Sequence, residues 1–98
     1  MEEILERIKA AKGVEGYVIC DQSGTCVRQG SPTGSMPSEL ATRYGNAMQT
    51  LAQKARHVIR DLDASHELDY LRIRCTKHEL MVAFDKDFLV IVIQKWGN

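Results

Sequence analysis

The side chains that could do chemistry in this 98-residue chain are few and widely spaced. Its three histidines, His57, His66 and His78, do not show the spacing of metal ligands. The Asp-Lys-Asp run at residues 85–87 brings two carboxylates together but lacks the rest of a calcium loop, so it predicts a tight hairpin turn. The sequence has no glycine-rich nucleotide-binding motif and no nucleophile beside a base. We therefore expect no enzyme, no metal, no cofactor and no small-molecule substrate.

The three cysteines, Cys20, Cys26 and Cys75, are odd in number and form no C-x-x-C motif. The N-terminus lacks the features of a signal peptide, and no apolar run approaches the roughly 18 residues of a membrane span. This pattern predicts a cytosolic protein with reduced thiols and no membrane insertion. Their positions allow Cys20 and Cys26 to face each other across a hairpin, and plain small core residues are favoured over a structural disulfide.

The charge balance argues against nucleic acid as a partner. Thirteen basic residues match thirteen acidic ones, and the pI is about 6.8, whereas general nucleic-acid binding needs clustered positive charge. Residues 70–74 combine an aromatic with two arginines, but RNA-binding sheets carry more aromatics on a basic surface. Arg72 and Arg74 therefore either guard an edge strand against random pairing or make contacts across a subunit boundary, and we favour a subunit contact over RNA.

The order of hydrophobic patterns predicts one α+β domain over residues 1–98. A short helix at 2–12 precedes a hairpin of strands at 14–20 and 25–29, a loop at 30–37, a long helix at 38–62 and three strands at 68–76, 79–84 and 88–94. A two-residue turn at 77–78 and a three-residue turn at 85–87 are expected to join the last three strands.

These turns predict the two faces of the sheet. One face, carrying Leu71, Ile73, Val82, Val90 and Val92 among others, is expected to seat the long helix. The opposite face would carry Arg72, Arg74, Met81, Leu89, Ile91 and Ile93. The first helix, with Ile4 and Ile8, would cover only part of it, and the remaining apolar area is typical of a docking site. Leu89, Ile91 and Ile93 fit either a groove or plain core.

The long helix shows two apolar stripes. The first is predicted to lie on the sheet and comprises Leu40, Tyr44, Ala47, Leu51, Ala55, Val58 and Leu62. The second is rich in small residues and comprises Ala41, Gly45, Met48, Ala52 and Ile59. Small residues allow a second helix to approach closely. The second stripe therefore either sinks into its own domain or meets the long helix of another copy.

Local segments across these elements resemble the roadblock-type dynein light chain family. They are KGVEG (12–16), KAR (54–56), RDLD (60–63), LRIR (71–74), ELMVA (79–83), DKD (85–87) and LVIVIQ (89–94). The similarity spans nearly the whole chain. Phe84 stands where the family often has proline, Cys75 replaces a more usual polar residue, and the loop at 30–37 is longer than usual.

The resemblance implies a fold and an assembly. The fold is a profilin- or longin-like roadblock domain, with a five-stranded sheet, a short N-terminal helix and one long central helix. The assembly is a dimer with itself or a close paralogue, with the two sheets joined at residues 71–74 and the two long helices side by side. The expected dimer interface is then Ala41, Gly45, Met48, Ala52, Ile59, Leu71, Arg72, Ile73 and Arg74.

The resemblance also implies a function. It is that of a non-catalytic light chain that binds the dynein intermediate chain in a motor for microtubule-based transport, in the cytoplasm and cytoskeleton or in a cilium. The expected groove for the intermediate chain is lined by Ile4, Ile8, Met81, Leu89, Ile91 and Ile93. The alternative is a roadblock-type scaffold or regulator of a small GTPase, because the fold does not fix the partner.

Overall fold

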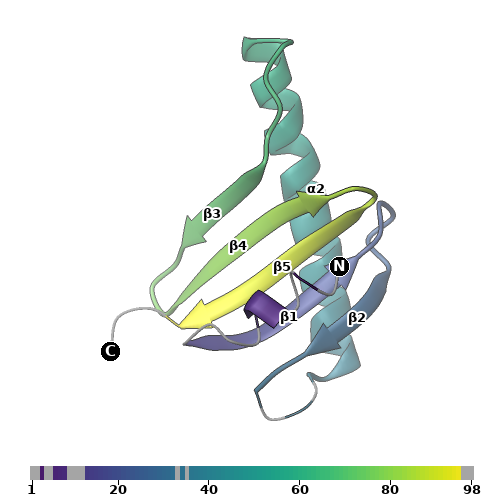
Figure 1. Ribbon diagram of the computed structural model, residues 1–98, viewed down its shortest axis with the longest axis vertical. Helices are drawn as coiled ribbons and strands as arrows, with labels where there is room; N and C mark the ends of the chain where they lie inside the picture. Colours follow the sequence, from purple (N-terminus) through teal and green to yellow (C-terminus); the bar gives the residue numbers. More distant parts are fainter. Residues whose placement is uncertain (1–2, 4–5, 9–12, 33, 35, 96–98) are drawn as a thin grey trace.

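The computed structural model describes residues 3, 6–8, 13–32, 34 and 36–95. A five-stranded sheet and one long helix form most of this part (Figure 1). In chain order the elements are β1 (Val14–Cys20), β2 (Cys26–Gly30), α2 (Ser38–Leu62), β3 (Tyr70–Arg74), β4 (His78–Asp85) and β5 (Phe88–Lys95). The strand order is β2-β1-β5-β4-β3, and every neighbouring pair is antiparallel. The predicted α+β class, with five strands and one long central helix, is confirmed.

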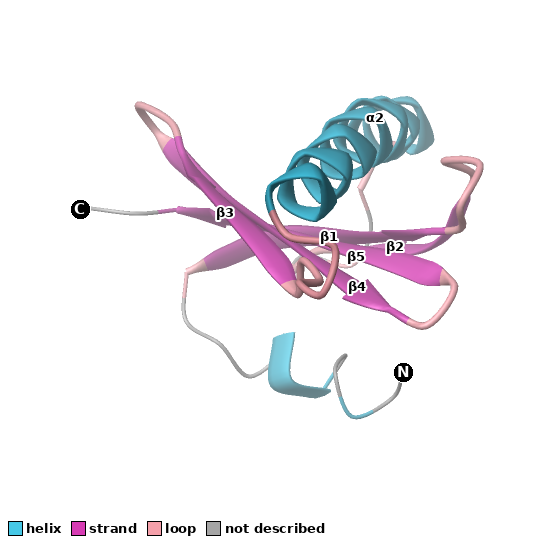
Figure 2. Cartoon of the chain, turned by 90° about the horizontal axis from the view of Figure 1, so that it is seen from above, coloured by secondary structure: helices cyan, strands magenta, loops and turns pink. Residues whose placement is uncertain are grey.

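The sheet lies between two helical layers (Figure 2). The face that α2 covers is called the helix face, and the opposite one the distal face. Glu3 and residues 6–8 are helical and lie over the distal face. The rest of the helix predicted at 2–12, including Ile4, falls outside the described residues.

Local chemistry explains the bounds of α2, which are the predicted ones. The helix begins directly after Pro37, with Glu39 in its first turn and Arg60 in its last, which suits the helix dipole. It ends where Asp63 turns to an extended conformation and donates its backbone N–H to the carbonyl oxygen of Ile59 at 3.1 Å. At 1.5 Å per residue, α2 is about 37 Å long, close to the longest dimension of the molecule, 41 Å.

The turn between β1 and β2 is built on Asp21. Its Oδ1 accepts the backbone N–H groups of Ser23 and Thr25, each at 3.0 Å, which is the pattern of an Asx turn. The buried side chain of Gln49 on α2 donates from Nε2 to the backbone oxygen of Asp21 at 2.7 Å. This hydrogen bond ties the middle of the long helix to the hairpin.

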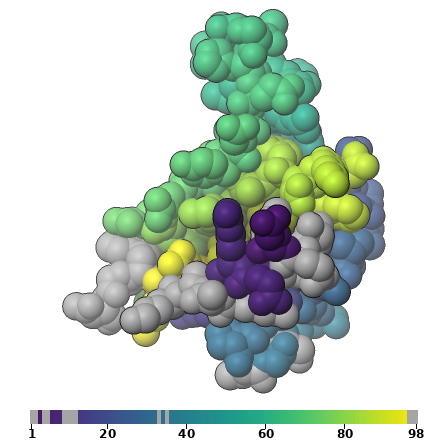
Figure 3. Space-filling view, viewed as in Figure 1, coloured from purple at the N-terminus to yellow at the C-terminus, as the bar shows by residue number. Residues whose placement is uncertain are grey.

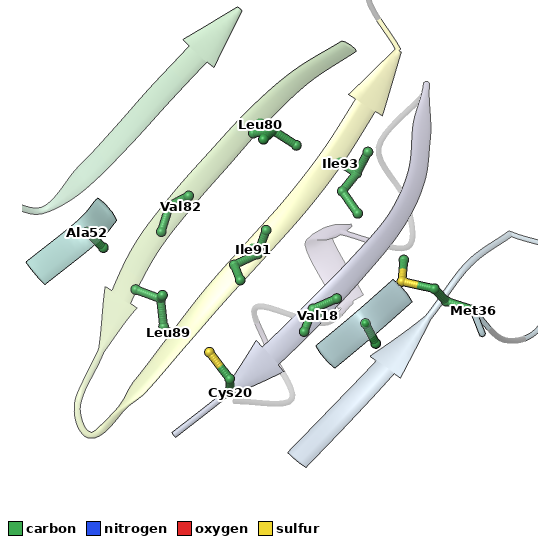
Figure 4. Close-up of a cluster of buried hydrophobic side chains, with 10 residues drawn as sticks. Val18, Cys20, Met36, Ala52, Leu80, Val82, Leu89, Ile91 and Ile93 are labelled. Carbon is green, nitrogen blue, oxygen red and sulfur yellow. The ribbon is translucent and has the colours of Figure 1, made fainter. Parts of the chain in front are cut away.

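The main core fills the space between α2 and the sheet (Figure 4). It consists of Val18, Cys20, Met36, Ala41, Ala52, Leu80, Val82, Leu89, Ile91 and Ile93. A smaller cluster on the distal face contains Ile8, Tyr17, Ile19 and Val90. Both faces of the central strands β1 and β5 are therefore buried, which explains the uninterrupted apolar run of β5.

The predicted facing of β5 is wrong. The structure pairs Val82 with Ile91 and Leu80 with Ile93, so Leu89, Ile91 and Ile93 lie on the helix face. The expected three-residue turn contains only two residues, since Asp85 already pairs with Phe88. A shift of one residue moves every side chain of a strand to the other face, and Val90 and Val92 accordingly lie on the distal face.

The predicted pairing of β3 with β4 is shifted by two residues. Ile73 pairs with Leu80 instead of Val82, and Arg74 pairs with Glu79. An even shift preserves the facing, so Leu71 and Ile73 pack on the helix face as expected.

The two stripes of α2 are exchanged relative to the prediction. Ala41 and Ala52 are fully buried and Gly45 is buried, whereas Leu40 and Leu51 of the other stripe are exposed. The helix approaches so closely that a Cβ on Gly45 would lie 3.0 Å from the backbone oxygen of Gly24. The small residues therefore face the sheet together with Met48, while Leu40, Leu51, Val58 and Leu62 of the bulky stripe face outward and its Tyr44 packs against the core.

Candidate interaction surface

The outward side of α2 carries four exposed large apolar side chains, here called the α2 stripe. It consists of Leu40, Leu51, Val58 and Leu62. Val58 is 55% exposed and Leu62 is 79% exposed. Spacings of 11, 7 and 4 residues return to one side of an α-helix, so the stripe follows the helix from its first turn to its last. An exposed apolar surface of this kind is typical of a protein interface.

The strand that follows α2 has an open edge. Among the described strands β3 pairs with β4 alone, so its other side presents unpaired backbone groups of the kind that add a further strand. The connection at residues 63–69 leads from the end of α2 directly to the start of β3 (Figure 1). The exposed aromatic ring of Tyr70 stands at the start of this edge. The α2 stripe and the β3 edge are therefore joined at one end of the molecule.

Two open hollows lie along α2 and combine apolar with basic side chains. The first, of about 310 Å³, is lined by Leu40, Arg43, Tyr44, Ala47 and Met48. The second, of about 420 Å³, is lined by Gln53, Lys54, His57 and Val58. Each hollow shares a residue with the α2 stripe, so the stripe has a basic flank.

The structure separates the residues that were predicted for a dimer interface. Ala41, Gly45 and Ala52 are buried under their own helix, and Met48 and Ile59 are half-buried. The first three are occupied by packing on the sheet of their own chain, so they are not available for a contact with a second helix. Residues 71–74, the other half of the prediction, form the open strand β3.

Arg72 and Arg74 hold a buried carboxylate on the distal face. Arg72 donates from Nε to Oε1 of Glu79, and Arg74 donates from Nη2 to Oε2 at 3.2 Å. The Glu79 side chain is only 6% exposed, whereas both arginine side chains are more than half exposed. Burial alone would raise the pKa of Glu79, but the hydrogen bonds and charges of the two arginines outweigh it and hold that pKa below its ordinary value. Sequence reasoning singled out the arginines but missed the buried partner that they share.

This arrangement predicts a pH-dependent stability. A carboxyl group whose pKa is lowered by folding stabilises the fold above its unfolded pKa, and that contribution is lost as the pH falls through the folded pKa. We expect Glu79→Gln to lower the urea midpoint at about pH 7, and the difference from the unchanged protein to shrink at about pH 3. Urea titrations followed by circular dichroism measure both midpoints. A difference that is the same at the two pH values would contradict the assignment to Glu79.

The distal face does not assemble the predicted groove. Leu89, Ile91 and Ile93 are core residues of the helix face, and Ile4 lies outside the described residues. Ile8 is buried against the sheet, in contact with the cluster of Tyr17, Ile19 and Val90. The described N-terminal residues lie over this face (Figure 3, purple). Of the predicted groove residues, only Ile8 and the half-buried Met81 are found on the distal face in the described part of the chain.

The described residues contain neither a membrane-spanning helix nor a cluster of metal-ligating side chains. None of the helices found there is long and apolar enough to cross a membrane. No group of three or more histidine, cysteine, aspartate or glutamate side chains is arranged there to hold a metal ion.

The fold is similar to that of solved bacterial proteins. A Roadblock/LC7 domain from Streptomyces avermitilis superposes with a TM-score of 0.80 at 9% identity, covering 93% of this chain and 73% of that one. The gliding protein MglB from Thermus thermophilus gives 0.76 at 13% identity, covering 96% and 70%. MglB from Myxococcus xanthus gives 0.70 at 13% identity, covering 91% and 70%.

The expectation of a dynein light chain is corrected by these comparisons. The three structures named above are a bacterial Roadblock/LC7 domain and two MglB proteins, and none of these three is a dynein subunit. The dynein intermediate chain as partner, and with it the role in microtubule-based transport or a cilium, is therefore not upheld. The physical reason is that the matching segments form strands and a helix of the shared fold, and a fold does not determine the partner.

The comparisons support a broader family than the dynein light chains, and the match covers nearly the whole chain. Residues 1–95 match the family model of the Roadblock/LC7 domain. The sheet order, the long helix on one face and the similar solved structures agree with that match. The chain belongs to the Roadblock/LC7 domain family.

Proposed function

We propose that this protein is a non-catalytic, self-associating scaffold or regulator of a small GTPase. The observation that carries the proposal is the α2 stripe beside the open edge of β3. The α2 stripe exposes Leu and Val side chains beside the open edge of β3. In an isolated chain this apolar surface stays in contact with water, which costs free energy.

A second copy of the chain fits this surface. Two-fold symmetry brings the same patch of each copy together, so two β3 edges pair with each other and two α2 stripes face each other. The stripe residues are large enough to interdigitate as ridges and grooves between helices. Fully burying one Leu or Val side chain stabilises an interface by about 1.5–3 kcal/mol. An MglB protein of the same fold is described as having a tetrameric arrangement, which supports self-association.

A GTPase partner follows from the family and from the chemistry of the helix. The resemblance to the roadblock family implies, as its alternative to a dynein role, a scaffold or regulator of a small GTPase. The basic flank of α2, with Arg43 and Lys54 lining its two hollows, offers positive charge for an acidic protein surface. A symmetric dimer presents this flank twice.

The proposal is tested in two steps on the full chain. Light scattering at several concentrations measures the mass, and a dimer is expected. Calorimetric titration with small GTPases from the same organism, each loaded with GDP or with a non-hydrolysable GTP analogue, is expected to show binding that depends on the nucleotide. A monomer at all concentrations would contradict the self-association. Failure of every GTPase to bind, or binding that ignores the nucleotide, would contradict the assigned partner class.

A further inference from the structure

Two thiols face each other at the hairpin that contacts α2. Cys20 is the last residue of β1 and Cys26 the first of β2, and the structure pairs them directly across the two strands. Both pack in the core cluster of the helix face, where Figure 4 shows Cys20 at the end of β1. Side chains of directly opposite residues on one face are near neighbours. Both residues are reduced thiols in this structure.

The register makes this pair close. The next pair toward the turn is Asp21 with Thr25, joined by a backbone N–H···O bond of 3.0 Å. A β-bulge lies between the pairs Ile19–Arg28 and Cys20–Cys26, and beyond it Cys20 and Cys26 stand directly opposite each other. Directly opposite residues of an antiparallel pair have Cα atoms about 4.5–5.5 Å apart. Disulfides span Cα separations of about 4.4–6.8 Å. The pair therefore lies within the range of a disulfide bond.

We propose that Cys20 and Cys26 are a site of reversible disulfide formation across the β1–β2 hairpin. The oxidant is a small-molecule disulfide such as oxidised glutathione. The Cys26 thiolate attacks one sulfur of glutathione disulfide, whose S–S bond breaks and releases one glutathione. Cys20 then loses its proton and attacks Cys26 Sγ, which expels the second glutathione. Two protein thiols are oxidised to one disulfide, and one glutathione disulfide is reduced to two thiols.

The order of the two attacks follows from burial. Cys20 is fully buried, while Cys26 is only half-buried and is the one that a solvent molecule can reach. Burial and the neighbouring Asp21 raise the pKa of the Cys20 thiol to about 11, so little of it is thiolate at neutral pH. Cys20 therefore reacts second, within the protein, where proximity to the mixed disulfide offsets its low reactivity.

Neither thiol is held in place by a strong interaction. Cys20 Sγ lies 4.0 Å from the backbone oxygen of Gly45, and Cys26 Sγ lies 3.5 Å from that of Arg28. Thiol hydrogen bonds are weak, so a rotation about χ1 can turn the two sulfurs toward each other. The Cys26 sulfur is half-buried, so reduced glutathione can reach the bond once it forms, and exposed disulfides are among the readily reduced ones. Reversibility is therefore expected.

The third cysteine must be removed from the experiment. Cys75 is exposed and follows β3, at the opposite edge of the sheet from β2, so its competing reaction is a disulfide between two chains. Cys75→Ser provides a background in which only the hairpin pair can react. Adding Cys26→Ser to it gives the matched control, because Cys26 is half-buried and its replacement disturbs the core less than replacement of Cys20 would.

The test is incubation of the folded Cys75→Ser protein with oxidised glutathione, followed by alkylation and digestion. Trypsin leaves both cysteines on one peptide, residues 13–28, and cleavage before Asp21 separates them unless they are bonded. We expect a peptide that is two hydrogen masses lighter, resists alkylation and stays joined after the second cleavage. Excess reduced glutathione should restore both thiols, and the Cys26→Ser control should give none of this.

Two outcomes would overturn the proposal. One is full alkylation of both thiols after oxidation, with the circular dichroism spectrum unchanged. The other is a glutathione adduct at Cys26 that never proceeds to the internal bond. Neither outcome depends on the GTPase partner or on self-association, so this experiment tests the disulfide independently of the proposed function.

Discussion

The Val58→Glu protein is expected to be a monomer at concentrations at which the unchanged protein is a dimer. Val58 lies in the α2 stripe and is 55% exposed in the single chain. In a two-fold interface the substitution places two carboxylates in apolar contact, and an unpaired buried charge costs several kcal/mol. Since 1.4 kcal/mol is a factor of ten, the dissociation constant should rise by at least about a hundredfold. Sedimentation equilibrium or light scattering measures it.

The chain offers a matched control for this experiment. Val27 is the same residue type, is 53% exposed, and lies on β2 at the other edge of the sheet. Val27→Glu should therefore leave the dimer unchanged. Both variants should keep the circular dichroism spectrum of the unchanged protein, because both side chains already contact water. Equal dimer masses for Val58→Glu and the unchanged protein would show that the α2 stripe is not the interface.

The second large effect is expected from Leu89→Ala. Leu89 is 1% exposed and is among the largest fully buried side chains of the described core. Truncation of a buried leucine to alanine removes its transfer free energy and leaves a cavity, at a cost of about 2–5 kcal/mol. The free energy of unfolding, from urea titration, should fall by that amount. A loss of this size would bear out the helix-face position of Leu89, because a groove residue loses much less on truncation.

The control is Leu62→Ala, at a leucine that is 79% exposed. Both truncations are best made in the Val58→Glu protein, so that association adds nothing to the measured stability. Leu62→Ala should then change the free energy of unfolding by less than about 0.5 kcal/mol. Similar losses for the two leucines would contradict the register that places Leu89 beneath α2.

The elements themselves could be predicted because their signals are local. Gly13 and the turn at residues 21–24 bound β1, and Pro37 stands immediately before α2, so the predicted limits of both elements agree with the structure. The strands of the second half agree within one or two residues for the same reason, because runs of β-branched and apolar residues end at charged turns.

The facing of β5 could not be predicted because one residue in a turn decides it. The turn at Lys86 contains no glycine or asparagine, which are the usual marks of a two-residue hairpin turn. Lys86 nevertheless adopts φ 56°, a left-handed conformation that non-glycine residues rarely adopt. The pairing of the long apolar strands with each other and with α2 outweighs that local cost. Tertiary packing thus determines the register of β4 with β5, and this register cannot be predicted from the residues near the turn.

The side of α2 that lies on the sheet could not be predicted from side-chain size. The bulky stripe was expected there, but β-branched and leucine side chains of β1 and β5 already fill that space. At the closest approach of α2, small residues such as Ala41 and Ala52 leave room for them, since protein interiors are close-packed. The buried polar residues Gln49 and Glu79 were missed as well. Glu79 could have been found from its position opposite Arg74, had the register been known.

The far end of α2 extends past the sheet (Figure 1). Every residue from 60 to 67 is exposed, so little packing holds this stretch in the single chain. Helix ends without tertiary contacts open locally at little cost in free energy, and their amide protons then exchange rapidly with solvent. A second chain packed along Val58 and Leu62 would suppress that opening and slow the exchange. The hydrogen-exchange rates of the amides in the last turns of α2 are therefore expected to depend on the fraction of the protein that is assembled.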